Sequence, residues 1–368
     1  MSTSGNAAVL NEISGEFSIQ QVEVEAPRDD EVLIEISACG ICHTDLVIRH
    51  GALPVPTPVV LGHEGAGHIV SVGTAVTNVK VGDPVILSYS SCGNCVACES
   101  HETPYCHEFV ARNFGASRPD GSTAFSTNGE KIHSHFFGQS SFSTHVVTPI
   151  RNVVKAPSDI ALDILAPLGC GIQTGAGSIL NELNVKTGSV VLVLGAGAVG
   201  MSAIMAARIA GAQTIIALDL SETRLALAKE LGASHCLLGD GRSVSALLQS
   251  INLSGADYIL DTTGVPALVN EAVSCLNIRG ALGLVAAYPH GQMMQVDFAT
   301  MMLKGQRVQG IVEGSAVPQD FIPELISYYR QGQFPFDRLI EHFDFTDINR
   351  AIKACESGNV IKPVLRMN

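Results

Sequence analysis

The sequence has few charged residues and no long hydrophobic run. Asp, Glu, Lys and Arg together make up 15% of its 368 residues, whereas hydrophobic residues make up 46%. This balance argues against an intrinsically disordered chain, and the length is sufficient for two domains with buried cores. No apolar stretch approaches the roughly 20 residues that a membrane-spanning helix requires. We therefore expect no membrane partner.

Positive charge is also scarce, with 22 Lys and Arg against 35 Asp and Glu, for a formal net charge of −13. A chain of this charge does not present a broad basic surface, so we expect no nucleic-acid partner. The N-terminal residues lack the basic and apolar regions of a secretory signal peptide, which favours a cytoplasmic location. In that reducing compartment the ten cysteines would more often bind metal than form disulfides.

A lobe at about residues 88–110 contains four closely spaced cysteines, Cys92, Cys95, Cys98 and Cys106. Four thiolates with the spacing C-x2-C-x2-C-x7-C can close a tetrahedral structural zinc site. An iron–sulfur cluster is the main alternative, because bacterial ferredoxins also contain C-x2-C-x2-C. In those proteins the fourth cysteine comes sooner and precedes a proline, whereas His107 follows Cys106 here. The spacing therefore favours zinc.

Two short glycine-flanked segments, residues 40–45 and 62–64, supply Cys42 and His63. A thiolate and an imidazole are two of the three protein ligands that an open zinc site needs, and Cys170 is the candidate for the third. Three ligands leave a coordination position for water or substrate, as catalytic zinc requires. Taken singly, each of these residues would more often be an ordinary core residue. The motifs elsewhere in the chain favour the metal site.

The pattern of the chain changes near residue 162. The preceding residues form short alternating runs separated by turns, which predict a β-rich, barrel-like unit. From there to about residue 312, helical runs and β-branched runs alternate, as in a parallel α/β sheet. Mixed structure follows. We therefore predict a catalytic domain at 1–171, a nucleotide-binding domain at 172–313 and a segment at 314–368 that completes the catalytic domain.

A Gly-x-Gly-x-x-Gly motif is formed by Gly195, Gly197 and Gly200. It follows a predicted strand, opens a predicted helix and precedes Asp219 by nineteen residues, a context typical of dinucleotide binding. The glycines permit a tight turn and close approach of the pyrophosphate to the helix N-terminus. Asp219 would bond the adenosine ribose and repel a 2′-phosphate, so the motif favours NAD over NADP.

Phenylalanine is concentrated between residues 107 and 142. Six of the thirteen phenylalanines lie there: Phe109, Phe114, Phe125, Phe136, Phe137 and Phe142. The density predicts a loop that folds over something apolar, such as a substrate, or a loop with its own small core.

Together these motifs resemble the zinc-dependent medium-chain alcohol dehydrogenases over nearly the whole chain. The resemblance implies an α/β fold, with a Rossmann doubly wound parallel-sheet coenzyme domain and a GroES-like β-barrel catalytic domain. Residues 138–142, 169–175 and 334–337 are similar to the aryl, or benzyl-type, alcohol dehydrogenases. The implied reaction is reversible oxidation of primary aromatic or allylic alcohols to aldehydes with NAD and two zinc ions per chain. Terpene alcohols (geraniol, perillyl alcohol) and short aliphatic alcohols are alternatives, and a dimer or tetramer is expected.

The resemblance also implies roles for individual residues. Cys42, His63 and Cys170 would bind the catalytic zinc, Asp45 and Glu64 would lie beside them, and Thr44 would carry the alcohol proton outward. The remaining implied roles are cofactor contacts by His43, Thr174, Val199, Arg224 and Lys362, and a substrate pocket formed by Phe136 and Phe137. Many animal members of the family have a proton-accepting histidine where this chain has Val47. Either the proton passes to solvent after Thr44 and the cofactor ribose, or another base serves.

A relative that binds a nucleotide without a catalytic metal is a further alternative. It would lack zinc ligands, and all three candidates are present.

Overall fold

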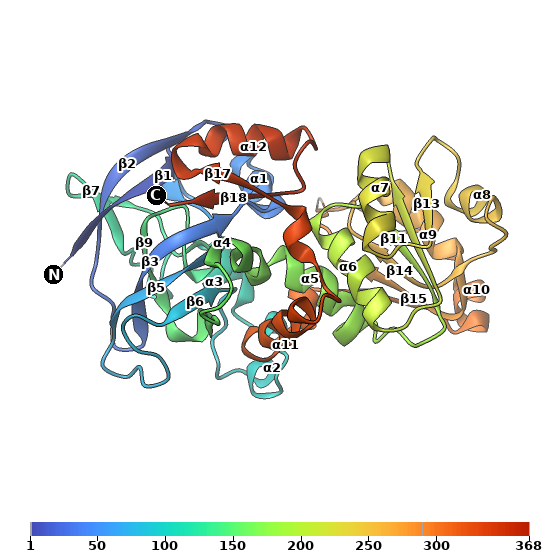
Figure 1. Ribbon diagram of the computed structural model, residues 1–368, viewed down its shortest axis with the longest axis horizontal. Coiled ribbons are helices and arrows are strands. Elements are labelled where there is room, and N and C mark those ends of the chain that lie inside the picture. The colour runs from blue at the N-terminus through green and yellow to red at the C-terminus, as the bar shows by residue number, and fades with distance from the viewer. Residues whose placement is uncertain (1, 289, 368) are drawn as a thin grey trace. The chain divides into compact units, whose positions relative to one another are not determined.

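The computed structural model of the protein describes residues 2–288 and 290–367 (Figure 1). The chain forms two compact units: unit 1 comprises Met1–Cys170, Val317–Pro323 and Asp337–Asn368, and unit 2 comprises Gly171–Ala316 and Glu324–Phe336. The predicted return segment is thus divided, because residues 314–316 and 324–336 group with unit 2. Two hydrogen bonds hold these residues there. Asn181 Nδ2 donates to the Gly314 carbonyl at 3.3 Å, and Arg208 Nη2 donates to the Gln333 carbonyl at 2.7 Å.

Unit 1 is built on two β-sheets. The five-stranded sheet has the order β4-β1-β2-β7-β8, with β1 Thr3–Leu10, β2 Phe17–Val24, β4 Val59–Val60, β7 Phe125–Thr127 and β8 Glu130–Ile132. The seven-stranded sheet has the order β10-β6-β5-β3-β18-β17, and β9 also pairs with β3. Its strands are β3 Glu31–Gly40, β5 Glu64–Val72, β6 Pro84–Leu87, β9 His145–Pro149, β10 Val153–Lys155, β17 Ile340–Asp344 and β18 Lys362–Arg366. The C-terminal strand β18 pairs antiparallel with β3, so the end of the chain completes this sheet.

Short helices connect the strands of unit 1. They are α1 His43–Arg49, α2 Val96–Glu99, α3 Phe109–Phe114, α4 Leu162–Leu165 and α12 Ile348–Glu356, with a 3-10 turn η2 at Phe136–Gly138. Helix α12 lies against β17 and β18 (Figure 1). It buries Ile348, Ala351 and Ile352, whose spacing of three and four residues places them on one face of the helix. Helix α11, Pro318–Arg330, begins in unit 1 and ends in unit 2.

Unit 2 contains a six-stranded sheet in which every pairing is parallel, with the order β13-β12-β11-β14-β15-β16. The strands are β11 Val190–Leu194, β12 Thr214–Asp219, β13 His235–Leu238, β14 Ala256–Asp261, β15 Leu276–Leu284 and β16 Arg307–Gly310. The helices are α5 Gly171–Gly177, α6 Ala198–Ile209, α7 Glu222–Leu231, α8 Val244–Gln249, α9 Pro266–Ser274 and α10 Phe298–Lys304. The strand order reverses between β11 and β14, which is where doubly wound sheets bind nucleotides. The predicted fold class is confirmed.

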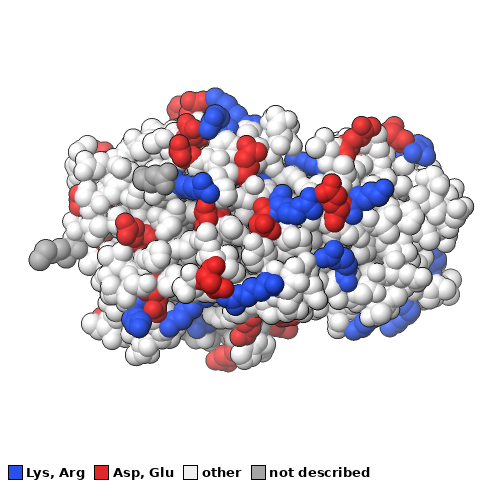
Figure 2. Space-filling model, viewed as in Figure 1, with Lys and Arg blue, Asp and Glu red and all other residues white. Residues whose placement is uncertain are grey.

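No helix among the described residues has both the length and the hydrophobicity needed to cross a bilayer. On the face of the molecule shown in Figure 2, acidic and basic side chains are interspersed.

Candidate functional site

The four-cysteine cluster (Cys92, Cys95, Cys98 and Cys106) is formed in unit 1. Its four sulfur atoms lie within 4.8 Å of one another. The backbone N–H groups of Cys92 and Glu108 donate to Cys106 Sγ at 3.2 and 3.4 Å. Hydrogen bonds from the His107 and Cys98 backbone lower the pKa of Cys95 to about 6, whereas burial raises the pKa of Cys106 to about 12. Four sulfurs at this separation fit a structural zinc ion, which would favour the thiolate form of each.

The three-ligand cluster (Cys42, His63 and Cys170) is also brought together in unit 1. Cys42 Sγ lies 4.0 Å from Cys170 Sγ, and the ligand atoms of all three residues lie within 4.8 Å of one another. All three side chains are buried. Among the residues that the structure describes, His63 Nε2 is buried and has no hydrogen-bond partner. An unpaired ring nitrogen beside two thiols is the arrangement that a zinc ion would satisfy.

Asp45 organises the two loops that carry Cys42 and His63. Cys42 caps the N-terminus of α1, and Asp45 lies in the first turn of this helix. Asp45 Oδ2 accepts the Cys42 N–H at 3.0 Å, while Oδ1 accepts the Gly62 N–H at 3.0 Å and lies 3.0 Å from His63 Nδ1. With Nδ1 bonded to a carboxylate, the lone pair of the neutral ring is on Nε2, the atom that faces the sulfurs.

The ionisable groups in and around the three-ligand cluster stabilise one another's charged forms. A hydrogen bond with Cys170 lowers the pKa of Cys42 well below its ordinary value, and Lys362 and His63 add to the effect. Burial disfavours charge on the His63 ring, but Asp45 and Cys42 outweigh it and raise the pKa of His63. Because a metal ligand must be deprotonated, zinc binding would release protons from these groups.

Glu64 and Lys362 form a buried ion pair beside the three-ligand cluster. Lys362 Nζ lies 2.9 Å from both carboxylate oxygens of Glu64 and 3.1 Å from the Ile41 carbonyl oxygen. Burial raises the pKa of Glu64; it disfavours charge on Lys362 too, but Glu64 and Cys42 outweigh it and raise the pKa of that ammonium. The Lys362 ammonium is thus buried and bonded inside unit 1, and its expected contact with the cofactor stays a prediction.

Phe136 and Phe137, the residues predicted to line the substrate pocket, both pack against the His63 ring. The Phe137 ring stacks on the imidazole with 4.4 Å between centroids, and the Phe136 ring meets it edge-on at 5.4 Å. Phe114 of α3 packs against both phenylalanines. These rings are 0% and 3% exposed and cover one another, and their proposed pocket role stays a prediction. They belong to the core of unit 1.

The remaining predicted residues of α1 lie at its first turn. Thr44 is half-buried, with its hydroxyl 3.9 Å from Cys42 Sγ, and His43 is exposed. Val47 is half-buried.

The three glycines of the nucleotide motif serve three different needs in unit 2. Gly195 has φ +91°, a conformation that side chains rarely adopt. A Cβ at Gly200 would collide with the Gly195 carbonyl oxygen, so the start of α6 packs closely on the turn. A Cβ at Gly197 would meet open space, which leaves the backbone accessible to a ligand. A tight turn, close packing and free approach are what pyrophosphate binding requires of these positions, so the motif fits a dinucleotide.

Asp219 lies at the end of β12, beside this turn. Its Oδ2 accepts the Ala196 N–H at 2.6 Å and its Oδ1 accepts the Ser221 N–H at 2.9 Å. Arg224 lies in the first turn of α7, and its backbone N–H donates to the Ser221 hydroxyl at 3.3 Å. The carboxylate is thereby held at the carboxyl end of the sheet, where a ribose would be bound.

Thr174 and Val199 lie on two helices that pack closely in unit 2. A Cβ on Gly175 of α5 would collide with the Val199 carbonyl oxygen at the start of α6. The Thr174 hydroxyl donates to Glu313 Oε2 at 3.4 Å, and Gln173 Nε2 donates to the same oxygen at 3.2 Å.

Sequence reasoning missed two buried polar residues, Glu313 and Gln139. Glu313 holds α5, as described above, and Gln139 bonds the loop that carries His63. The signal for Gln139 was a single amide among small residues, placed between the paired Phe136 and Phe137 and Phe142.

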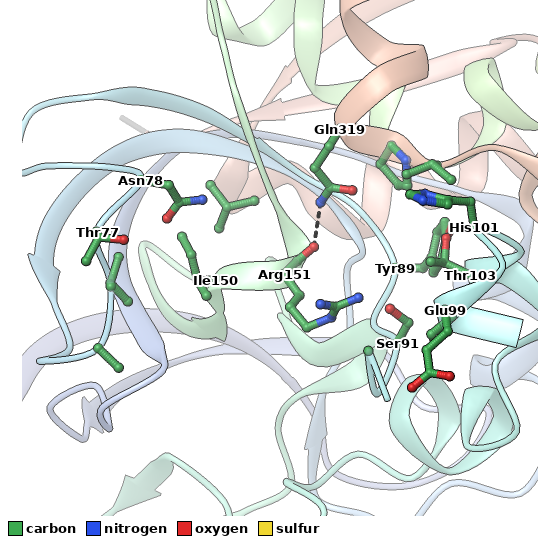
Figure 3. A pocket seen from close by; sticks show the side chains of 17 residues that line it. Thr77, Asn78, Tyr89, Ser91, Glu99, His101, Thr103, Ile150, Arg151 and Gln319 are labelled. Atoms are coloured by element: carbon green, nitrogen blue, oxygen red, sulfur yellow. Dashed lines mark hydrogen bonds between the residues drawn. The ribbon is translucent and has the colours of Figure 1, made fainter. Parts of the chain in front are cut away.

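A cavity of about 670 Å³ opens beside the four-cysteine cluster in unit 1 (Figure 3). Cys98 is the one metal-cluster residue in its described lining, and Arg151 and His101 supply basic groups. Gln319 Nε2 donates to the Arg151 carbonyl across this region at 2.6 Å. The cavity is not lined by the three-ligand cluster.

The comparisons with known proteins agree with one another on a single family. Residues 28–158 match the alcohol dehydrogenase GroES-like domain, and residues 198–328 match the zinc-binding dehydrogenase family. The chain is 43% identical over 365 residues to a geraniol dehydrogenase from Castellaniella defragrans, covering 98% of this chain and 97% of that protein.

Two solved structures agree over the whole of both chains. An alcohol dehydrogenase zinc-binding domain protein from Burkholderia ambifaria is 46% identical with a TM-score of 0.98. A benzyl alcohol dehydrogenase from Acinetobacter calcoaceticus is 41% identical with a TM-score of 0.96. Each alignment covers 100% of this chain. The chain therefore belongs to the zinc-dependent medium-chain alcohol dehydrogenases.

Proposed function

We propose that this protein reversibly oxidises primary aromatic or allylic alcohols to aldehydes, using NAD and a zinc ion bound by Cys42, His63 and Cys170. The observation that carries the proposal is the buried three-ligand cluster, in which His63 Nε2 faces two sulfurs without a partner of its own among the described residues. The relatives support the substrate class. Benzyl alcohol and geraniol both carry the hydroxyl on a carbon next to an unsaturated carbon.

Bound zinc would supply a Lewis acid that lowers the pKa of the alcohol, and bound NAD would accept the hydride. Asp45 would keep the His63 ring in the tautomer whose Nε2 binds metal. The Thr44 hydroxyl, which lies 3.9 Å from Cys42 Sγ, would accept the alcohol proton and pass it outward. The product aldehyde gains conjugation from the adjacent unsaturated carbon, which favours oxidation.

NAD is proposed over NADP because Asp219 lies beside the glycine turn. A carboxylate at this position hydrogen-bonds the ribose hydroxyls of NAD and repels the 2′-phosphate of NADP.

A substrate panel tests the proposal directly. Initial rates would be measured for benzyl alcohol, geraniol and ethanol with NAD and with NADP. We expect kcat/KM for benzyl alcohol or geraniol to exceed that for ethanol by roughly several hundredfold, because several apolar contacts each add about 1–3 kcal/mol of discrimination. A Cys170→Ala control should lose activity together with one zinc ion. Equal efficiency on ethanol and benzyl alcohol would contradict the assignment.

The same panel separates the two alternatives. Preference for geraniol over benzyl alcohol would identify a terpene-alcohol dehydrogenase, as the geraniol dehydrogenase relative suggests. Preference for ethanol would identify a short aliphatic alcohol dehydrogenase.

We also propose that the protein is a homo-oligomer, a dimer or tetramer. Several large apolar side chains of unit 2 are exposed, including Phe298, Met302 and Leu303 of α10 at 73–79%. Strand β16 is at the edge of the parallel sheet, with one side unpaired in the described chain. An apolar cluster and an open sheet edge favour burial against a second copy. Sedimentation analysis of the wild type and of Phe298→Glu would test this, and a monomeric wild type would contradict it.

A further inference from the structure

Gln139 is a buried amide whose hydrogen-bonding capacity is fully used. Its side chain is 1% exposed and follows the turn η2. Nε2 donates to the His63 carbonyl at 2.9 Å and to the Ser88 carbonyl at 3.1 Å. Oε1 accepts the Gly65 N–H at 3.2 Å and the Ser141 hydroxyl at 2.6 Å. Two donors and two acceptor positions are the whole inventory of an amide side chain.

These bonds connect the segments that carry His63 and Cys170. His63 precedes β5, and Ser88 follows β6. The Ser88 hydroxyl donates to the Gly169 carbonyl at 2.6 Å, directly before Cys170. A continuous path of hydrogen bonds therefore runs from the His63 backbone through Gln139 and Ser88 to the backbone next to Cys170.

The loop that presents Gln139 has an unusual backbone. His135, Phe137 and Ser140 have φ values of 67°, 52° and 58°, and Gly138 has φ 68°. Non-glycine residues adopt this region at a cost, so the surrounding contacts must hold them there. The Ser140 hydroxyl helps to do so, since it accepts the Phe136 N–H at 2.9 Å and donates to the Val60 carbonyl at 2.6 Å. Such residues concentrate at functional sites.

The contact between β5 and the Gln139 side chain is tightly packed. A Cβ at Gly65 would collide with the Ser141 side chain and come within 3.1 Å of Gln139 Oε1. The Gln139 amide is therefore packed and hydrogen-bonded between β5 and the loop that follows β6. A side chain that is shorter or has no N–H donor would leave at least one of the two facing carbonyls unbonded.

We propose that Gln139 is a positioning residue that sets the separation of His63 and Cys170, and so determines how firmly the three-ligand cluster holds zinc. The inference rests on the proposed zinc site. Its action differs from that of Asp45, which orients the His63 ring, because Gln139 bonds the His63 backbone and reaches Cys170 through Ser88.

The test is the rate at which the catalytic zinc leaves the holoenzyme to a chromogenic chelator under native conditions. Gln139→Met keeps the side-chain volume and removes all four hydrogen bonds. We expect it to release this zinc at least about tenfold faster, the range typical of residues that support metal ligands. Ser141→Ala removes one of the four bonds and should accelerate release by a smaller factor. Zinc in the four-cysteine cluster should leave at the wild-type rate in both variants.

Asn113→Leu is the matched control. Asn113 is also a fully buried amide of unit 1; its Oδ1 accepts the Ser90 N–H at 2.8 Å, and its Nδ2 donates to the Ser90 and Phe109 carbonyls. The Asn113→Leu substitution should lower the melting temperature of the protein but leave the release rate of the catalytic zinc unchanged. A cobalt-substituted enzyme gives a second readout, since a change in ligand separation in Gln139→Met should shift the visible absorption bands.

The outcomes are distinguishable. A wild type without zinc at the three-ligand cluster would overturn the proposed function and this inference with it. A wild type that holds zinc there, with wild-type release from Gln139→Met and Ser141→Ala, would overturn the inference alone. Equal acceleration by Asn113→Leu would also overturn it, because the effect would then be general destabilisation. If Gln139→Met does not fold, Ser141→Ala decides the question.

Discussion

The Phe137 ring lies flat against the His63 imidazole, with 4.4 Å between the ring centroids and 26° between the ring planes. Asp45 bonds Nδ1 of the same imidazole, and Phe136 meets it edge-on. The ring is thereby fixed by two aromatic contacts and a hydrogen bond, and Nε2 is left directed at the sulfurs. The orientation of a zinc ligand thus depends on two phenylalanines that lie more than seventy positions later in the chain.

Phe137→Ala should reduce stability without changing substrate preference. We expect a loss of about 3–5 kcal/mol in the free energy of unfolding, the usual cost of a Phe→Ala change in a core. The ratio of kcat/KM for benzyl alcohol to that for ethanol should stay as in the wild type, because the ring is only 3% exposed. Urea unfolding and initial rates measure the two quantities.

The matched control is Phe17→Ala. Phe17 is also buried in unit 1, where it meets Phe142 edge-on at 5.8 Å. It should cost similar stability and leave catalytic zinc retention unchanged, whereas Phe137→Ala should weaken retention. A large fall in the benzyl-to-ethanol ratio with unchanged stability would show that Phe137 contacts substrate after all.

The protein should contain two zinc ions per chain that differ in lability. Four thiolates would close the site at the four-cysteine cluster, whereas three protein ligands would leave a position open at the other. A mild chelator should remove one zinc ion together with the activity before any unfolding occurs, and elemental analysis with circular dichroism would follow both. Iron, or a single zinc ion per chain, would contradict the assignment of the two clusters.

Asp219→Gly should shift cofactor preference towards NADP. The change removes the carboxylate that would repel a 2′-phosphate, and Arg224 in the neighbouring helix could then pair with that phosphate. The measurement is kcat/KM for both cofactors at saturating alcohol. Since Asp219 also accepts the Ala196 N–H, Asp219→Asn serves as a control that retains an acceptor for this bond. An unchanged preference ratio in Asp219→Gly would place the ribose elsewhere.

The buried pair of Glu31 and Arg118 should make stability fall in acid. Arg118 donates to both carboxylate oxygens of Glu31 at 2.7 and 3.0 Å. Burial disfavours the charge, but the nearby His135 ring and the hydrogen bonds from Arg118 outweigh it and lower the pKa of Glu31 from 4.5 to about 2. The unfolded chain therefore binds the proton more readily, so this contribution is complete above about pH 5 and is lost as the pH falls towards 2.

Glu31→Gln tests the pair. At neutral pH it should cost about 3 kcal/mol in the free energy of unfolding, and the difference from the wild type should shrink below about pH 4. Urea unfolding across this pH range measures both. Glu25→Gln is the control, because Glu25 contacts Arg118 at 2.9 Å but its side chain is 59% exposed. It should cost less than about 1 kcal/mol. A pH-independent difference for Glu31→Gln would contradict the assignment.

Local features of the sequence determined most of the fold. Periodicity and the change of pattern near residue 162 predicted a β-rich unit and a parallel α/β unit, because hydrophobic spacing depends on the local geometry of helices and strands. The spacing of the four cysteines predicted a structural metal site, and the spacing of the three glycines predicted a dinucleotide-binding turn. Their geometry is set within a few residues of chain, so it can be read directly from the order of the residues.

Contacts between residues that are far apart in the sequence became known only from the tertiary structure. The stacking of Phe137 on His63, the ion pair of Lys362 with Glu64 and the bond of Gln139 to the His63 carbonyl each join residues that lie more than seventy positions apart. No local pattern specifies such a pairing, because it depends on how sheets and loops pack. For that reason the sequence alone did not predict that Phe136 and Phe137 pack on the His63 ring, or that Lys362 pairs with a buried carboxylate.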